Sequence, residues 1–440
     1  MRFALPFVAA VAWCGLLACS SGDGGQADAG DAGSDAPTNA CSQPPRAFWT
    51  WDLSVMPPKD IQTAATCYGE SAHAYVFVSD DVWAAGQMTQ PQVNAVLDAF
   101  ENHTPSDPSR GSYAMDTQTF GDPPDVDADP HVYLFYTSLG VFKGQRFDGF
   151  FRDIDETNDP HSNHVEMLHM DPTGPSPADS DYMLGIIIHE FVHLINYKYD
   201  TAEEGWLNET LAESAMALGG YNTDLPTAQA YCKAMYTTPL CVTGYSDYGA
   251  TFSWGAYMLD RWGTGFLRAV LQDPNHGPPS VQAHLPNALT FQDAFGEFSV
   301  AATINQHAIG DGRYGYVSAQ LGALGKETPG LVDGQSHASG MVPWSARAIR
   351  LTPTGAGTVA IDLASADFAT LRVHTFVFDP ANPAAGTVTA QTVASATAAF
   401  SVPVAANQVV DLVVAAAPGA SVPDLQPAST LFSYTATYTP

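Results

Sequence analysis

The feature that most constrains this chain is an apolar helical stretch that carries polar side chains inside it. Residues 180–200 read SDYMLGIIIHEFVHLINYKYD, and Ser180 and Asp181 favour a helix start at this point. The apolar residues recur at helical spacing: Leu184, Ile187, Ile188, Phe191, Val192 and Ile195. A helix this apolar is expected to be buried. The histidines and the glutamate inside it therefore need partners, because burying them without partners costs several kcal/mol.

The polar side chains of this helix have the spacing of metal ligands. Histidines four residues apart lie on one face of a helix, so His189 and His193 can direct nitrogens at one ion. Glu190 lies about 100° round the helix from His189, where it can reach a water on that ion but is poorly placed as a ligand. The alternative is a core helix whose histidines find protein partners. A metal would supply partners for all three side chains.

A second segment, GWLNETLAES, offers the ligand that the histidines lack. A catalytic zinc takes three protein ligands and a water, and no third histidine follows at the HExxHxxGxxH spacing. Glu209 comes sixteen residues after His193, which leaves room for the first helix to end and the chain to turn back. Glu213 lies one turn further on the same face, where it can accept the outer N–H of a zinc histidine. A solvated helix face is the alternative for either glutamate alone, but Trp206 and Leu211 indicate a largely buried helix.

These motifs resemble a known group of proteins. HExxH followed by a helix with N-E-x-x-x-[DE] is similar to the signature of the gluzincins, the thermolysin-like metallopeptidases. The segments HEFVHLINY, GWLNETLAESA and YGATFSWGAYMLDRWG look most like the hyicolysin-type peptidases. Upstream, DVDADPHVYLFY, DGFFRDID and SNHVEMLHMD resemble that group's strands, so the resemblance covers roughly residues 70–310. The gap between HExxH and the next glutamate is shorter than in thermolysin, which favours the hyicolysin type.

The resemblance implies a zinc metalloendopeptidase that hydrolyses polypeptide substrates. The residues that match the group's motifs are the zinc ligands His189, His193 and Glu209, the catalytic base Glu190, and the supporting residues Glu213 and Asn208. Glu190 would take a proton from a zinc-bound water and return it to the leaving amine. Thermolysin-like enzymes stabilise the oxyanion with a tyrosine or histidine. Tyr248 is the candidate here, with Tyr245 and Tyr257 as alternatives, and a core or interface role is open for each.

Two other functions remain open from the sequence. The first is an inactive gluzincin-like protein that serves in binding or adhesion at the cell surface. Such a relic usually loses the base or a ligand, and Glu190 and all three ligands are present here. The second is an aminopeptidase of the same clan. It would need an acidic anchor for the substrate amine, for which the sequence has no separate motif.

Residues before the zinc helix suggest further features of the site. SNHVEML (162–168) is a candidate edge strand along which an extended substrate could pair, and we expect His161, His164 and His169 to be surface residues.

A calcium ion is a further candidate ligand. Asp125, Asp127 and Asp129 alternate as at the start of a calcium loop, but Pro130 replaces the required glycine and Tyr136 occupies position twelve. The loop is therefore no EF-hand, and a looser Ca²⁺ site is left open.

The N-terminus reads as an export signal. MRFALPFVAAVAWCGLLACSSG has one basic residue and an apolar run too short to span a bilayer as a mature helix. Leu16 to Cys19 resemble a bacterial lipobox, so we expect Cys19 to be lipidated and the protein to be anchored at the cell surface. A cleaved signal and a secreted protein are the alternative. Residues 20–40 are small, polar or acidic and are typical of a flexible tether.

The remaining cysteines predict disulfides. Without Cys14 in the signal and Cys19 on lipid, four cysteines are left in an exported chain. Of the three connectivities, the simplest pairs Cys41 with Cys67 and Cys232 with Cys241.

Composition and periodicity complete the expected architecture. Acidic residues outnumber basic ones 46 to 16, a formal net charge of -30, which argues against nucleic-acid binding and leaves the lipid anchor as the sole membrane contact. We expect a monomer of α+β class, with a zincin domain in which a mixed sheet precedes a helical half, and a C-terminal all-β sandwich. The expected boundaries are 1–18 signal, 19–44 tether, 45–340 metallopeptidase domain and 341–440 sandwich.

Overall fold

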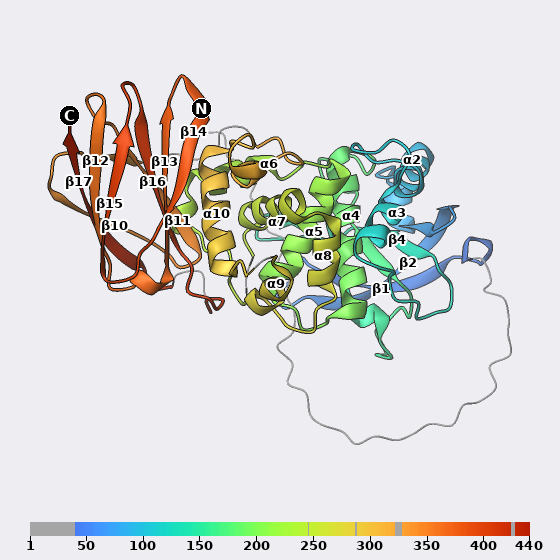
Figure 1. Ribbon diagram of the computed structural model, residues 1–440. Helices are drawn as coiled ribbons and strands as arrows, with labels where there is room; N and C mark the ends of the chain where they lie inside the picture. Colours follow the sequence, from blue (N-terminus) through green and yellow to red (C-terminus); the bar gives the residue numbers. More distant parts are fainter. Residues whose placement is uncertain (1–39, 245, 287, 322–327, 424–426) are drawn as a thin grey trace, which may run out of the picture. The chain divides into compact units, whose positions relative to one another are not determined.

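The computed structural model describes residues 40–244, 246–286, 288–321, 328–423 and 427–440. The signal segment, Cys19, the tether up to residue 39 and Tyr245 lie outside the described residues. Contacts between Cα atoms divide the chain into two units, one with residues up to 114 and 123–194, the other with 115–122 and 195–440. Along the chain, Figure 1 shows strands and helices in blue and cyan, then helices in green and yellow, then strands in orange and red. The protein is therefore of mixed α+β class.

The first unit is built on a mixed sheet of six strands in the order β1-β2-β3-β4-β8-β7. The strands are β1 (Arg46–Asp52), β2 (Lys59–Glu70), β3 (Ala74–Ser79), β4 (Val132–Tyr136), β7 (Gly149–Phe151) and β8 (Met167–Met170). Strands β3, β4 and β8 run parallel, and the outer pairs are antiparallel. Every residue of β3 and β4 is buried, as expected for parallel strands covered on both faces.

Helices complete this unit. They are α1 (Asp80–Ala84), α2 (Gln90–Glu101), α3 (Ser112–Thr119) and α4 (Asp181–Tyr199), with the short elements η1 (Ala40–Ser42), β5 (Val141–Phe142), β6 (Gln145–Arg146) and η2 (Asp153–Glu156). Helix α2 begins with a capping box between Thr89 and Gln92. Strand β3 ends at Ser79, where α1 begins. Helix α3 continues past residue 114, and α4 past residue 194, into residues assigned to the second unit.

The second unit begins with a helical half. Its helices are α5 (Gly205–Gly219), α6 (Leu225–Lys233), η3 (Met235–Thr237), α7 (Tyr248–Trp262), α8 (Thr264–Leu271), α9 (Pro278–His284), α10 (Phe291–Ile304) and η4 (Gly310–Gly312). Helices α5 and α7 approach closely at Gly255. A Cβ atom at that position would lie 2.6 Å from the Thr210 carbonyl oxygen and 3.1 Å from the Ser214 nitrogen. Only glycine at position 255 therefore allows α5 and α7 to lie this close together.

The chain ends in a β-rich region of two sheets, ordered β10-β17-β12-β15 and β14-β13-β16-β11-β9. The elements are β9 (Thr328–Gly330), β10 (Ser336–Met341), β11 (Ser345–Leu351), β12 (Gly357–Ala364), η5 (Phe368–Thr370), β13 (Leu371–Asp379), β14 (Asn382–Gln391), β15 (Thr397–Val404), β16 (Val409–Ala416) and β17 (Thr430–Thr439). Strands β9 and β10 pair with β11 and β17, so this region starts before the boundary expected at residue 341.

Strand β16 shows how this region joins the helical half. All of its residues are buried, although in a structure of two packed sheets every second residue of a strand normally points outward to solvent. Residues Val300 and Ile304 of α10 pack with Phe376 and Val413, and thereby cover the outer face of the sheet.

A helix that crosses a bilayer must be both long and apolar. None of the helices in the residue ranges given above meets both requirements.

The close approach at Gly255 leads to a stability prediction. We expect Gly255→Ala to lower the thermal midpoint, because overpacking costs about 1–3 kcal/mol. That cost exceeds the ~1 kcal/mol by which alanine is preferred to glycine inside a helix. Gly265→Ala in α8 is the matched control, since a Cβ there meets no atom within 4 Å, and its midpoint should stay equal or rise. Circular dichroism melts of both variants test this, and equal upward shifts would contradict the packing argument.

Candidate metal centre

Helix α4 carries the candidate ligands, and its apolar residues anchor it in the first unit. The Phe191 ring packs against the rings of Phe100 and Tyr113, at centroid distances of 5.5 and 5.6 Å. Strand β7 approaches the helix at Gly149, where a Cβ atom would lie 2.8 Å from Cγ2 of Ile186. The apolar periodicity of the sequence therefore buries the helix as expected.

The two histidines of α4 direct their side chains at the same point. The Nε2 atoms of His189 and His193 are 3.0 Å apart, and the rings are nearly perpendicular, with an interplanar angle of 80°. Two nitrogens bound at ~2.05 Å to a tetrahedral ion would lie about 3.3 Å apart. The two nitrogens are therefore spaced as two ligands of one ion are.

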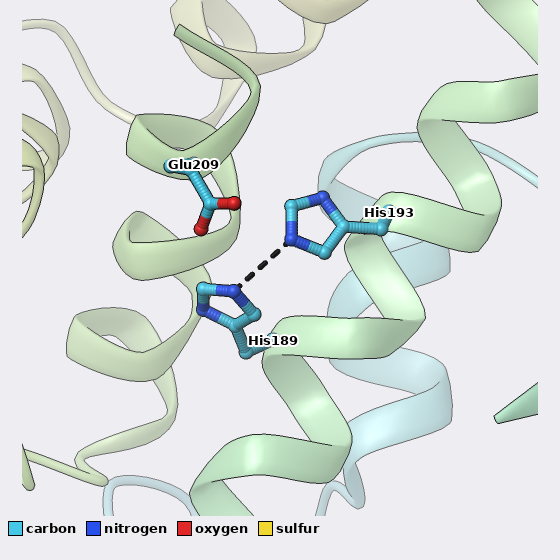
Figure 2. Close-up of side chains that lie close together, drawn as sticks. All are labelled: His189, His193 and Glu209. Carbon is cyan, nitrogen blue, oxygen red and sulfur yellow. Dashed lines mark hydrogen bonds between the residues drawn. The ribbon is translucent and has the colours of Figure 1, made fainter. Parts of the chain in front are cut away.

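Glu209 supplies a carboxylate at this point. It lies on α5, which begins after Glu204 and ends at Gly219; the next residue, Gly220, has the left-handed conformation that suits a helix C-terminus. Ligand atoms of His189, His193 and Glu209 all lie within 4.8 Å of one another. Figure 2 shows the three side chains pointing toward one another. Two imidazoles and one carboxylate are a donor set that Zn²⁺ accepts, with one position left for water or substrate.

Glu190 lies beside these ligands on the same helix. It is buried, and its Oε2 atom accepts a hydrogen bond of 2.9 Å from the backbone N–H of Phe151 in β7. The carboxylate is therefore held at the edge of the sheet next to the candidate metal ligands.

The edge strand is a correction to the sequence analysis. Residues 162–168 were expected to form it, but only Met167 and Leu168 of that segment lie in a strand. This strand, β8, lies between β4 and β7, and β7 is the strand at this edge of the sheet. The reason lies in the order of the strands. After β7 the chain turns back, and β8 is placed between β7 and β4, where Met167 pairs with Tyr133. Strand β8 is therefore paired on both sides, and β7 is the outermost strand next to it.

The other expected site residues are placed on the helices of the second unit. Glu213 is buried on α5 one turn after Glu209, and Asn208 is partly buried directly before it. Tyr248 is partly buried at the first position of α7. Tyr257 lies in the core instead, and its hydroxyl donates to the Arg313 carbonyl at 3.1 Å. Tyr257 is thereby less suited than Tyr248 to an oxyanion role.

The cysteines follow the expected pairing only in part. Cys41 and Cys67 are joined by a disulfide, with Cα atoms 5.1 Å apart. Cys232 and Cys241 are buried free thiols, so the expected second disulfide is not formed. The Cys232 sulfur points from α6 toward Ser253 on α7, at 3.7 Å from its Oγ. Burial raises the pKa of the Cys232 thiol to about 12, and that of Cys241 well above its usual range.

One histidine expected at the surface is buried in the sheet. His169 is fully buried, and both of its ring nitrogens have partners. Nε2 contacts Asp155 Oδ2 at 2.8 Å, and Nδ1 contacts the Thr50 hydroxyl at 3.0 Å. Arg152 bonds the same Asp155 at 2.7 Å. Desolvation lowers the pKa of His169, so the imidazole is held neutral. His169 therefore serves the packing of β8, while His161 is partly exposed and His164 is exposed, as expected for surface residues.

A second group of acids joins two of the candidate calcium ligands to Glu166, which the sequence analysis missed. Asp125 and Asp127 lie with Glu166, their ligand atoms within 4.8 Å of one another. Asp129 faces elsewhere, since it accepts from the Tyr75 hydroxyl at 3.0 Å and contacts the His131 ring. The sequence did contain a signal for the burial of Glu166: the residue directly precedes the apolar strand MLHM.

The described residues thus define an α+β protein with a candidate metal centre of two histidines and one glutamate. No protein family model matches the chain. The neutral metalloprotease ShpI of Staphylococcus hyicus is 22% identical over 280 residues, which are 58% of this chain and 60% of that protein. The chain therefore spans less than two thirds of the length of this curated relative.

Similar solved structures were also found. The pre-peptidase C-terminal domain of a collagenase from Bacillus anthracis is 7% identical, with 26% of this chain and 97% of that chain covered and a TM-score of 0.18. A family GH115 4-O-methyl-alpha-glucuronidase is 10% identical, with 83% of this chain and 58% of that chain covered and a TM-score of 0.14. Neither TM-score supports an argument about the fold.

The geometry of the candidate centre predicts metal binding. We expect the purified chain to hold about one Zn²⁺, and His193→Ala to lose most of it because one of three ligands is removed. His103→Ala is the control, since that imidazole contacts Asp98 on α2 and is half exposed. Metal content measured by plasma mass spectrometry after gel filtration tests this. A zinc content unchanged in His193→Ala would exclude the assignment.

Proposed function

We propose that this chain is a zinc metalloendopeptidase of zincin fold that hydrolyses polypeptides. The observation that carries the proposal is the convergence of His189, His193 and Glu209 beside a buried Glu190. The likeness to the metalloprotease of Staphylococcus hyicus supports it, over the part of that protein that the chain covers.

In this proposal each ligand has a defined chemical state. His189 and His193 present the lone pairs of their Nε2 atoms, which requires both imidazoles to be neutral. Glu209 is ionised and offsets part of the ion's charge. A zinc ion, when bound, supplies Lewis acidity that lowers the pKa of water and polarises a carbonyl group. Glu213 and Asn208 support the ligands by hydrogen bonds.

Glu190 carries the proton in this reaction. Its Oε2 is held by the Phe151 N–H, which leaves Oε1 to take a proton from the attacking water and pass it to the leaving amine. The substrate lies extended beside β7, at the sheet edge whose Phe151 N–H holds Glu190. The Phe150 ring stacks on His169 and on Trp51, at 4.7 and 5.1 Å, and this stacking holds the edge strand in place.

The first test concerns the base. We expect Glu190→Gln to lower the rate of casein cleavage by about 10²–10⁴-fold, because general-base catalysis contributes that much, while zinc content stays the same. Glu70→Gln, an exposed position at the end of β2, is the matched control and should cleave as the wild type does. If the Glu190→Gln variant cleaves at the wild-type rate, Glu190 is not the base.

The same assay separates the alternative functions. An inactive binding protein would cleave neither casein nor small substrates with zinc bound. An aminopeptidase would release single residues from aminoacyl anilides and leave internal bonds of casein intact.

The second test concerns the oxyanion. We propose Tyr248 as the hydrogen-bond donor, and Tyr248→Phe should lower kcat by about 10²-fold with little change in KM, since the donor acts in the transition state. Tyr257→Phe is the matched control: its hydroxyl bonds the Arg313 carbonyl in the core, so stability should fall and kcat should hold. An unchanged kcat in Tyr248→Phe would remove Tyr248 from the mechanism.

A further inference from the structure

A second acidic cluster lies in the first unit. It consists of Asp125, Asp127, Glu156 and Glu166, which we call the acidic cluster. Three of its members, Asp125, Asp127 and Glu166, have ligand atoms within 4.8 Å of one another. The carboxyl group of Glu156, at the end of η2, faces that of Glu166. Four carboxyl groups from three separate segments therefore meet at one place.

Glu166 shows that the protein itself does not satisfy this cluster. The residue is only 2% exposed, and its Oε1 accepts a 2.6 Å hydrogen bond from the Val126 N–H. Its Oε2 is buried, and no N–H or hydroxyl donor of the described residues reaches it. The same holds for both carboxylate oxygens of Glu156. Leaving such oxygens buried without a donor is costly, so a positively charged partner is expected.

Few protein cations compensate the cluster. Arg46 lowers the pKa of Asp127, but burial and the neighbouring carboxylates raise that pKa by more. Burial and the facing carboxyl groups raise the pKa of Glu166 to about 7 and that of Glu156 to about 9.

The surroundings hold the acidic cluster in shape. The Arg152–Asp155 pair and the contact of Asp155 with His169 fix η2, so Glu156 follows a buried, bonded neighbour. On the other side, Asp129 is held by Tyr75, and the Asp129 N–H bonds Asp127 Oδ1 at 2.9 Å. Both neighbours of the acidic cluster, η2 and the Asp129 turn, are therefore held by hydrogen bonds.

We propose that Asp125, Asp127, Glu156 and Glu166 bind one calcium ion. The donor set is oxygen alone, with neither imidazole nor thiolate, which favours a hard cation over zinc. Ca²⁺ accepts six to eight oxygens in irregular geometry, and the carboxylates and water can supply them. Mg²⁺ requires a compact octahedron and gives up its water reluctantly, so it fits less well.

The ion would join three segments that the sequence separates. These are the loop before β4, the turn η2 and the start of β8. Since η2 follows β7 after one residue, the ion would also steady the strand whose Phe151 N–H holds Glu190. Calcium would thus stabilise the fold whether or not the proposed peptidase activity is correct.

The test uses the full chain, freed of calcium with EGTA and reloaded with one equivalent of Zn²⁺. We expect calorimetric titration with CaCl2 to show one site, and about 5 mM CaCl2 to raise the melting temperature by several degrees. Glu166→Gln should weaken binding at least tenfold and lose the shift. In EGTA this variant should melt at or above the wild-type temperature, because a buried repulsive charge is gone.

Two further variants keep the test independent of folding. Asp125→Asn changes an exposed ligand and should weaken binding several-fold, while Asp122→Asn, exposed in the same loop, should bind as the wild type does. Calcium binding and the melting temperature do not depend on catalysis. A failure of the proposed function would therefore leave both results valid. Absence of saturable binding, or binding unchanged in both Glu166→Gln and Asp125→Asn, overturns the proposal. An equal response to MgCl2 overturns the assignment to calcium.

Discussion

Ionisable side chains buried among apolar residues are the constraint on which the rest of this structure depends. Helices α4 and α5 are apolar enough to be buried, and their polar residues His189, Glu190 and Glu209 are buried as well. Desolvating such groups costs several kcal/mol unless charges or hydrogen bonds compensate them. The convergence of the ligand atoms is the arrangement in which one cation compensates three side chains at once.

Strand β7 is the short element that links the sheet to this chemistry. Its Gly149 allows α4 to approach, its Phe150 stacks on the buried His169, and its Phe151 N–H holds Glu190. The turn η2 follows at once, tied by Arg152 and carrying Glu156 to the acidic cluster. The candidate metal centre, which has two imidazoles, and the acidic cluster, which has only carboxylates, are therefore connected by a few residues of backbone.

Much of the fold could be predicted because its signals are local. Helix α4 was expected at 180–200 and spans Asp181–Tyr199, since nineteen residues of helical periodicity outweigh any other pattern. The short edge strand was misplaced because three residues have no usable period and pairing order depends on distant segments. The Cys232–Cys241 pairing failed for a similar reason: nearness in sequence does not place two sulfurs together, and Cys232 points at α7.

The sequence by itself determined that His189 and His193 share a helix face, because a spacing of four residues is one turn. It also determined which segments are apolar enough to be buried. Only the tertiary structure decided which strand forms the sheet edge, and which acids meet across long separations. Val126 and Glu166 are 40 residues apart and hydrogen-bonded. Such contacts depend on the pairing of β4 with β8, and no local pattern of residues encodes that pairing.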